Sequence, residues 1–125
     1  MNGVTLKKAL IVNEDDRRKL VEISNGLIHI SNLKVLFCKK GEHVLGNHWH
    51  TYPEVRYLLK GKVHYKLRNT INNEIIELDM EDGDILFTTG FITHTGIFSE
   101  DSIMIDGGQE AYVSREFNDV FDKIL

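Results

Sequence analysis

Apolar and polar residues alternate along most of the chain, in short runs that end at glycines or polar turns. In the clearest run, Val63, Tyr65 and Leu67 alternate with His64 and Lys66. Because successive side chains of a β-strand point to opposite faces, this alternation predicts a half-buried strand. Further extended runs occur at residues 9–12, 20–23, 33–38, 54–60, 74–78, 85–87 and 102–105. The pattern predicts about eight to ten short antiparallel strands that form an all-β sandwich or barrel.

The pattern changes only near the end of the chain. Apolar residues there recur three and four positions apart, which is the spacing of one face of an α-helix. They are Phe117, Val120, Phe121 and Ile124. Ser114 precedes them as a suitable N-cap. We therefore predict a short C-terminal helix over about residues 114–124, packed on its own domain or on a partner subunit.

Length and composition narrow the class of protein. A chain of 125 residues is expected to form a single domain, residues 1–125. Cys38 is its only cysteine, and no segment resembles a signal peptide, so we expect a cytoplasmic protein. The net charge of −4 and the lack of a basic stripe argue against a nucleic-acid partner. No apolar run is long enough to cross a membrane. Composition alone therefore indicates only a soluble cytoplasmic domain, and a small-molecule ligand or substrate is the partner that the candidate site described next implies.

Three histidines and one glutamate have the spacing of metal ligands. His48 and His50 are two positions apart, so both imidazoles point to one face of a strand. Glu54 opens the next strand after a tight connection, and His94 follows a later turn and strand that a closed barrel can place nearby. Such a ligand set suits one divalent transition metal ion, namely Fe, Mn, Co, Ni, Cu or Zn. A site without cysteine favours an open, reactive metal centre over a structural one.

Five further residues are candidates for contacts with a substrate. Arg56 shares the strand face of the predicted carboxylate ligand, where it would clamp an anion or form a salt bridge at the barrel rim. Tyr65 is at an inward-facing position of its strand, where we expect either an aromatic ring packed in the core or a hydroxyl group that lines the pocket. His43 precedes the histidine strand and would line the mouth of the site. Tyr65 and His43 are therefore the candidate catalytic proton carriers. Phe87 and Phe91 are expected as pocket wall and core.

Two segments resemble the motifs of the cupin family. Residues 41–61, GEHVLGNHWHTYPEVRYLLKG, resemble G-x5-H-x-H-x3/4-E-x6-G, with one extra residue before the first histidine. Residues 83–94 resemble the second motif, although the proline of its P-x-G-x-x-H ending is absent. With the strands between them, the motifs cover about residues 33–105. The resemblance implies an RmlC-like jelly-roll barrel, an antiparallel double-stranded β-helix that carries the four candidate ligands. Small cupins are commonly dimers, and exposed edge strands favour pairing, so a homodimer is expected.

The resemblance leaves several functions open. It implies a metal-dependent isomerase, epimerase or dioxygenase that acts on a small polar or anionic metabolite, or a non-catalytic cupin that binds or senses such a ligand. A shorter similarity points to sugar-nucleotide cupins, in which D-x-R-G-x-L precedes a G-x-H-x-H-like strand. Here the segment is DRRKL, residues 16–20, with Arg18 in place of the glycine. In some of those enzymes paired histidines transfer protons without a metal, which makes a metal-free sugar-nucleotide ketoisomerase the alternative.

Overall fold

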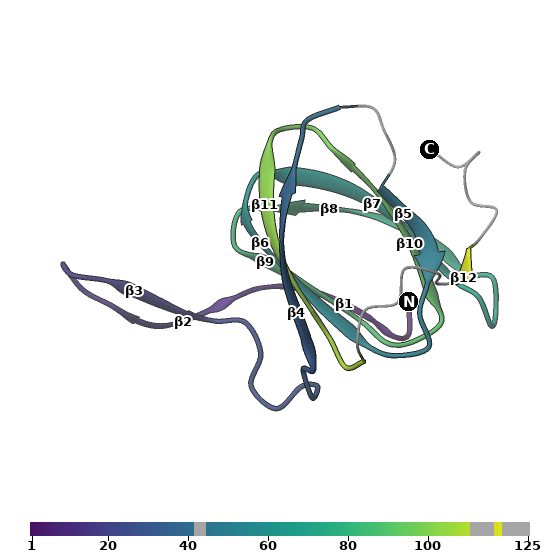
Figure 1. The fold of residues 1–125 in the computed structure, drawn as a ribbon, viewed down its shortest axis with the longest axis horizontal. Helices are drawn as coiled ribbons and strands as arrows, with labels where there is room; N and C mark the ends of the chain where they lie inside the picture. The colour runs from purple at the N-terminus through teal and green to yellow at the C-terminus, as the bar shows by residue number, and fades with distance from the viewer. Residues whose placement is uncertain (42–44, 111–116, 119–125) are drawn as a thin grey trace.

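A computed structural model of the chain describes residues 1–41, 45–110 and 117–118 (Figure 1). Within these ranges all regular secondary structure is β-strand, and all pairs of neighbouring strands are antiparallel. The strands are β1 (Val4–Lys8), β2 (Leu10–Glu14), β3 (Lys19–Glu22), β4 (Asn32–Cys38), β5 (Leu45–Trp49), β6 (Glu54–Lys60), β7 (Lys62–Asn69), β8 (Ile75–Glu81), β9 (Asp84–Thr88), β10 (Ile92–Phe98), β11 (Ser102–Gly108) and β12 (Phe117–Asn118). The predicted all-β, antiparallel class is confirmed. No helix in the described residues has the length and apolar character to cross a membrane.

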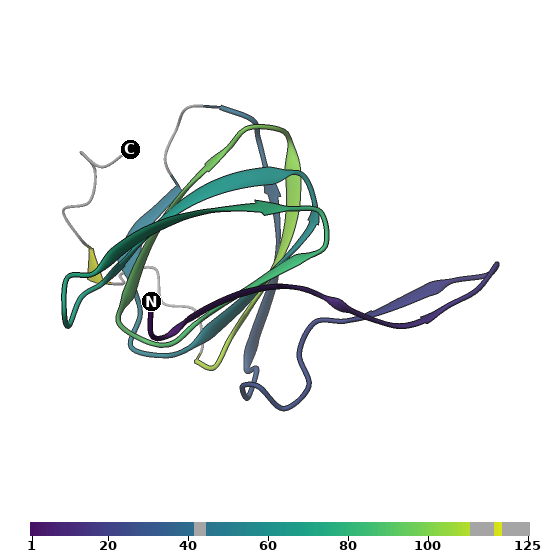
Figure 2. The ribbon, with the colours of Figure 1, turned by 180° about the vertical axis from the view of Figure 1, so that it is seen from behind.

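Two five-stranded sheets face each other and form the barrel (Figure 1). The first, which we call the charged sheet, has the order β1-β9-β6-β11-β4; the second, the histidine sheet, has the order β12-β5-β10-β7-β8. The remaining strands, β2 and β3, pair only with each other and form an arm that projects from the barrel (Figures 1 and 2). Asp15 closes the tip of this arm, where its Oδ1 accepts hydrogen bonds from the backbone amides of Arg17 and Arg18.

Strand β6 has both faces buried, and its inner face carries charged side chains into the barrel interior. One face carries Leu58, which belongs to the main core between the two sheets together with Leu67 and Leu86. The other face carries Val55 and Tyr57, which pack against a second, smaller cluster outside the barrel. Because side chains alternate along the strand, Glu54 and Arg56 share the inner face with Leu58. Both are buried.

The predicted C-terminal helix is wrong at the residues where the structure can be compared. Phe117 and Asn118 form β12, which pairs with Trp49 and His48 at the edge of β5. The open edge of β5 offers backbone donors and acceptors to these two residues, and this pairing replaces the helical bonds that the apolar spacing indicated. The rest of the predicted helix, at 114–124, lies outside the described residues.

One ion cluster on the outer face of the histidine sheet makes stability depend on pH. His64 on β7 lies 2.9 Å from Glu77 Oε1 through Nε2 and 2.8 Å from Asp79 Oδ1 through Nδ1. Hydrogen bonds to Glu77 and then to Asp79 raise the pKa of His64 above its usual range. A raised histidine pKa stabilises the fold at pH values below the unfolded-state pKa, and this stabilisation is lost as the pH rises through the folded-state pKa.

We therefore expect His64→Gln to destabilise the protein in acid and much less in base. At about pH 5.5 the free energy of unfolding should fall by about 0.2–1 kcal/mol, because solvent screens this exposed cluster. At about pH 9 wild type and variant should agree, because the wild-type imidazole is then neutral as well. Urea unfolding at the two pH values measures the difference, and a larger loss in base would contradict the assignment.

Candidate active site

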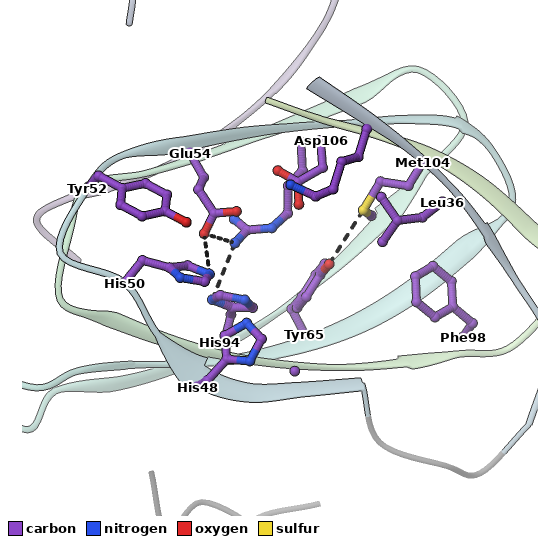
Figure 3. A pocket seen from close by; sticks show the side chains of 13 residues that line it. Leu36, His48, His50, Tyr52, Glu54, Tyr65, His94, Phe98, Met104 and Asp106 are labelled. Atoms are coloured by element: carbon purple, nitrogen blue, oxygen red, sulfur yellow. Dashed lines mark hydrogen bonds and ion pairs between the residues drawn. The ribbon is translucent and has the colours of Figure 1, made fainter. Parts of the chain in front are cut away.

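A cavity of about 300 Å³ lies between the two sheets (Figure 3). The charged sheet and the histidine sheet contribute different side chains to it. Its lining residues are Lys34, Leu36, Gly46, His48, His50, Tyr52, Glu54, Arg56, Tyr65, His94, Phe98, Met104 and Asp106. Three of the four predicted metal ligands are on its histidine wall, and Glu54 and Arg56 are on the facing wall. The sequence motifs thus converge on one cavity.

The three histidines form a compact cluster. His48 on β5 is the register partner of His94 on β10, and His50 follows β5 on the same face as His48. Their ring centroids lie 4.6 Å apart for His48 and His94, and 4.7 Å apart for His48 and His50. One nitrogen from each ring lies within 4.8 Å of the others. By spacing alone, this triad can hold a metal ion.

Gly46 allows the two histidine strands to approach each other. Its φ is +92°, and a Cβ atom at this position would lie 2.5 Å from the backbone oxygen of His94. Real Cβ atoms do not approach a carbonyl oxygen so closely, so a larger residue here would push β5 away from β10. The pairing also shifts register between His94 and Thr95. Sequence reasoning missed this role, although the glycine stands two positions before the H-x-H.

Arg56 organises the facing wall of the cavity. Its Nη2 lies 3.0 Å from Glu54 Oε1 and 3.3 Å from His94 Nδ1, and its Nη1 donates to Thr88 Oγ1 at 3.2 Å. Only 2% of its surface is exposed, so the guanidinium lies inside the barrel and not at the rim. Burial disfavours its charge, but the Glu54 carboxylate outweighs this and raises the pKa of Arg56. The residue stays a cation.

Glu54 is an ionised carboxylate held by two donors. Its Oε1 lies 3.0 Å from the guanidinium of Arg56 and 3.0 Å from Nε2 of His50. Although burial favours the neutral acid, the Arg56 cation and the His50 hydrogen bond hold the pKa of Glu54 below its usual range. Glu54 is not part of the histidine triad that can hold a metal. Its role as a fourth metal ligand stays a prediction.

The directions of these hydrogen bonds do not fit a metal bound by all three histidines. A guanidinium only donates, so His94 Nδ1 is an acceptor and the hydrogen of the neutral ring is on Nε2. Burial and the Arg56 charge lower the pKa of His94, which keeps the ring neutral. In this arrangement neither nitrogen of His94 offers a lone pair to an ion. The spacing suits a metal, whereas the protonation pattern suits proton transfer.

Tyr65 lies deeper in the cavity. Its hydroxyl donates to Met104 Sδ at 3.6 Å, and the Arg56 guanidinium carbon is 6.0 Å from its ring centroid. Burial strongly raises the pKa of Tyr65, so the phenol stays protonated. Tyr65 belongs to the core and also lines the pocket. Its role as a catalytic proton carrier stays a prediction.

Two predicted substrate contacts lie away from the cavity. Phe91 has a φ of +69° and its ring is 5.4 Å from that of Trp49, which points away from the histidine cluster. Neither Phe91 nor Phe87 is among the described residues that line the pocket. Their substrate roles stay predictions, and His43 lies outside the described residues.

Three polar lining residues were not found from the sequence. They are Lys34, Tyr52 and Asp106. The last of these carried a usable signal, because Asp106 has the same strand parity as the buried Met104. A charged residue at an inward position of a barrel strand indicates a functional role or a buried partner.

We compared the chain with known proteins, and its structure resembles several solved structures. No family model and no curated protein matches the sequence. The sugar 3,4-ketoisomerase QdtA of Thermoanaerobacterium thermosaccharolyticum, in a variant bound to TDP-4-keto-6-deoxyglucose, matches with a TM-score of 0.79 at 17% identity, over 98% of this chain and 91% of QdtA. The TDP-quinovose 3,4-ketoisomerase WlaRB of Campylobacter jejuni matches with a TM-score of 0.83 at 14% identity, over 98% and 97% of the two chains.

A third solved structure has a different activity. The 3'-monoepimerase ChmJ of Streptomyces bikiniensis, in complex with dTDP-quinovose, matches with a TM-score of 0.80 at 11% identity, over 98% of this chain and 72% of ChmJ. At these identities the matches establish the architecture, and they span nearly the whole chain. The protein has the RmlC-like cupin fold.

Proposed function

We propose that the protein is a sugar-nucleotide isomerase that converts a TDP-linked 4-keto-6-deoxyhexose into its 3-keto isomer. The observation that carries the proposal is the cluster of three imidazoles in the cavity of a barrel whose structural neighbours include several 3,4-ketoisomerases. The sugar-nucleotide alternative from the sequence is thus better supported than the metal-dependent main hypothesis.

The chemistry needs only proton transfers. A base removes the proton from C3 of the sugar, the resulting enediolate keeps the electron pair, and a proton is returned to C4 while the O3 proton moves to O4. His50 suits the role of base because its Nε2–H is hydrogen bonded to Glu54, which leaves Nδ1 as the basic nitrogen. His48, whose ring is next to it, would carry the proton to C4. The nearby positive charge of Arg56 favours the developing enediolate.

The direct test is turnover of TDP-4-keto-6-deoxyglucose in D2O, followed by proton NMR. We expect a new 3-keto product that carries deuterium at C4. TDP-glucose, which has no keto group, is the matched control and should stay unchanged. Deuterium at C3 with the 4-keto group retained would instead indicate epimerisation, and no exchange at either carbon would refute the proposal.

A metal-dependent enzyme or a metal-binding sensor is the second candidate, and the nitrogen spacing of the histidine triad favours it. In that case a bound ion would polarise a substrate oxygen, and His48, His50 and His94 would hold it. Chelation of the wild-type protein separates the two candidates.

We also propose a homodimer, because the chain carries two uncovered apolar surfaces. The first is the β2–β3 arm, which exposes Leu10, Ile11 and Val12 by 50–61% and stands clear of the barrel (Figures 1 and 2). The second is the outer face of the edge strand β4, which exposes Leu33, Val35 and Phe37 by 54–77%. A second copy can cover both surfaces through one two-fold axis, with each arm against the partner's β4.

The dimer is tested by placing a charge on each surface. Wild-type protein should sediment with twice the monomer mass, and a variant with Ile11→Asp and Phe37→Asp should sediment as a monomer. Ile71→Asp is the control, because Ile71 is as exposed as Phe37, at 78% against 77%, but lies on the β7–β8 turn, outside both surfaces. A dimer that survives the double substitution would contradict this interface.

A further inference from the structure

Asp106 is a buried charged residue of the cavity that the proposed proton transfer does not use. It lies on β11, faces inward beside Met104 and is 9% exposed. Its Oδ1 has no hydrogen-bond partner in the described part of the chain. A buried carboxylate oxygen without a donor is costly, so such an atom is a place where a ligand can supply the missing hydrogen bond.

The strand register places Asp106 across the cavity from the histidines. Its backbone partners are Lys34 on β4 and Arg56 on β6, so three charged residues form a row on the inner face of the charged sheet. Figure 3 shows Asp106 on the far side of the pocket from His48. A ligand that touches both walls would meet imidazoles on one side and this carboxylate on the other.

Asp106 acts on Arg56 through its charge and is not among the described hydrogen-bond partners of the guanidinium. The guanidinium makes its hydrogen bonds with Glu54, Thr88 and His94. Burial raises the pKa of Asp106 to about 6, and the charge of Glu54 and a side-chain hydrogen bond with Glu54 act in the same direction, against the opposing effects of Arg56 and Lys34. Asp106 lines the polar cavity, and its Oδ1 is the carboxyl oxygen that the described part of the chain leaves without a donor.

We propose that Asp106 is the residue that selects the hexose: its Oδ1 accepts a hydrogen bond from a hydroxyl group of the bound sugar. This inference rests on the proposed function and adds a specificity-determining contact to it. A site built around an acceptor discriminates strongly between ligands with and without the matching donor, because the acceptor otherwise stays buried and unpaired. The nucleotide part alone brings no sugar hydroxyl of the hexose to this wall.

The test compares the affinity for TDP-quinovose, which has no keto group to react, with that for TDP, by titration calorimetry. Asp106→Ala should weaken TDP-quinovose binding by about 10- to 100-fold, the loss expected for a hydrogen bond to a charged group, and TDP binding by less than about threefold. Asp106→Asn keeps the shape and an acceptor oxygen, so its loss should be smaller. Asp79→Asn removes an exposed carboxylate elsewhere and is the matched control.

The outcomes separate the two proposals. Wild-type protein that binds both ligands, with a variant that loses both equally, would overturn the role of Asp106 and leave the proposed function standing. Wild-type protein that binds neither ligand would overturn the proposed function and the hexose contact with it. If Asp106→Ala does not fold, Asp106→Leu, which fills similar space and has no acceptor, takes its place: an unchanged ratio of the two affinities overturns the inference, and a reduced preference for TDP-quinovose supports it.

Discussion

Replacing Arg56 with methionine is expected to destabilise the protein by about 3–5 kcal/mol, the loss typical of removing one partner from a buried ion pair. Arg56 and Glu54 are 2% and 5% exposed, and their charged atoms are 3.0 Å apart. Without the guanidinium, the carboxylate stays buried in the barrel beside His50, and it must either remain charged at high cost or take up a proton. Urea unfolding near neutral pH measures the change.

A double-substitution cycle tests whether the pair itself is the cause. The variant with both Arg56→Met and Glu54→Gln removes both charges, so it should lose clearly less stability than the sum of its two single variants. The control is Lys62→Met, whose partner Glu100 is 3.8 Å away at the surface and whose loss should stay below about 1 kcal/mol. Additive losses in the buried pair would show that packing, and not charge, holds Arg56 in place.

The period of the sequence was sufficient to predict an all-β antiparallel sandwich or barrel, because alternation directly reports which side of a strand is buried. The same parity placed Arg56 beside Glu54 and brought His48 and His50 to one face. Alternation does not report the partner of a strand, so the detached β2–β3 arm could not be predicted. The pairing of β12 with β5 was missed for the same reason, since a free sheet edge is a tertiary feature.

The sequence predicted which residues meet in the cavity better than it predicted their protonation and hydrogen bonding. Residue types and spacing identified three histidines that meet, but they do not say which nitrogen carries a hydrogen. That depends on Arg56, whose guanidinium reaches His94 across the cavity. The spacing of the motif therefore favours a metal, whereas the hydrogen bond from Arg56 favours a neutral ring at His94. Asp106 was missed because no motif includes it, although its inward parity was readable.

Replacing His50 with asparagine is expected to lower kcat for the keto sugar by about 10²- to 10⁴-fold, the usual contribution of one positioned acid or base. Asparagine has a similar size and keeps a donor for Glu54, so the fold and the affinity for TDP should change little. His64→Asn is the control, because that histidine is on the outer face of the barrel and should leave kcat unchanged. Rates from the NMR assay and TDP titrations give the two quantities.

Chelation of the wild-type protein decides what the His50 result means. If the histidines move protons, dialysis against EDTA should change neither kcat nor Tm, because no ion contributes to turnover or to the fold. If they are metal ligands, chelation should abolish turnover and lower Tm, and a divalent ion should restore both in wild type but not in His50→Asn. Loss of activity in the variant is common to both mechanisms. The response of the wild type to the chelator is therefore the measurement that separates an imidazole acting on carbon from one that binds a cation.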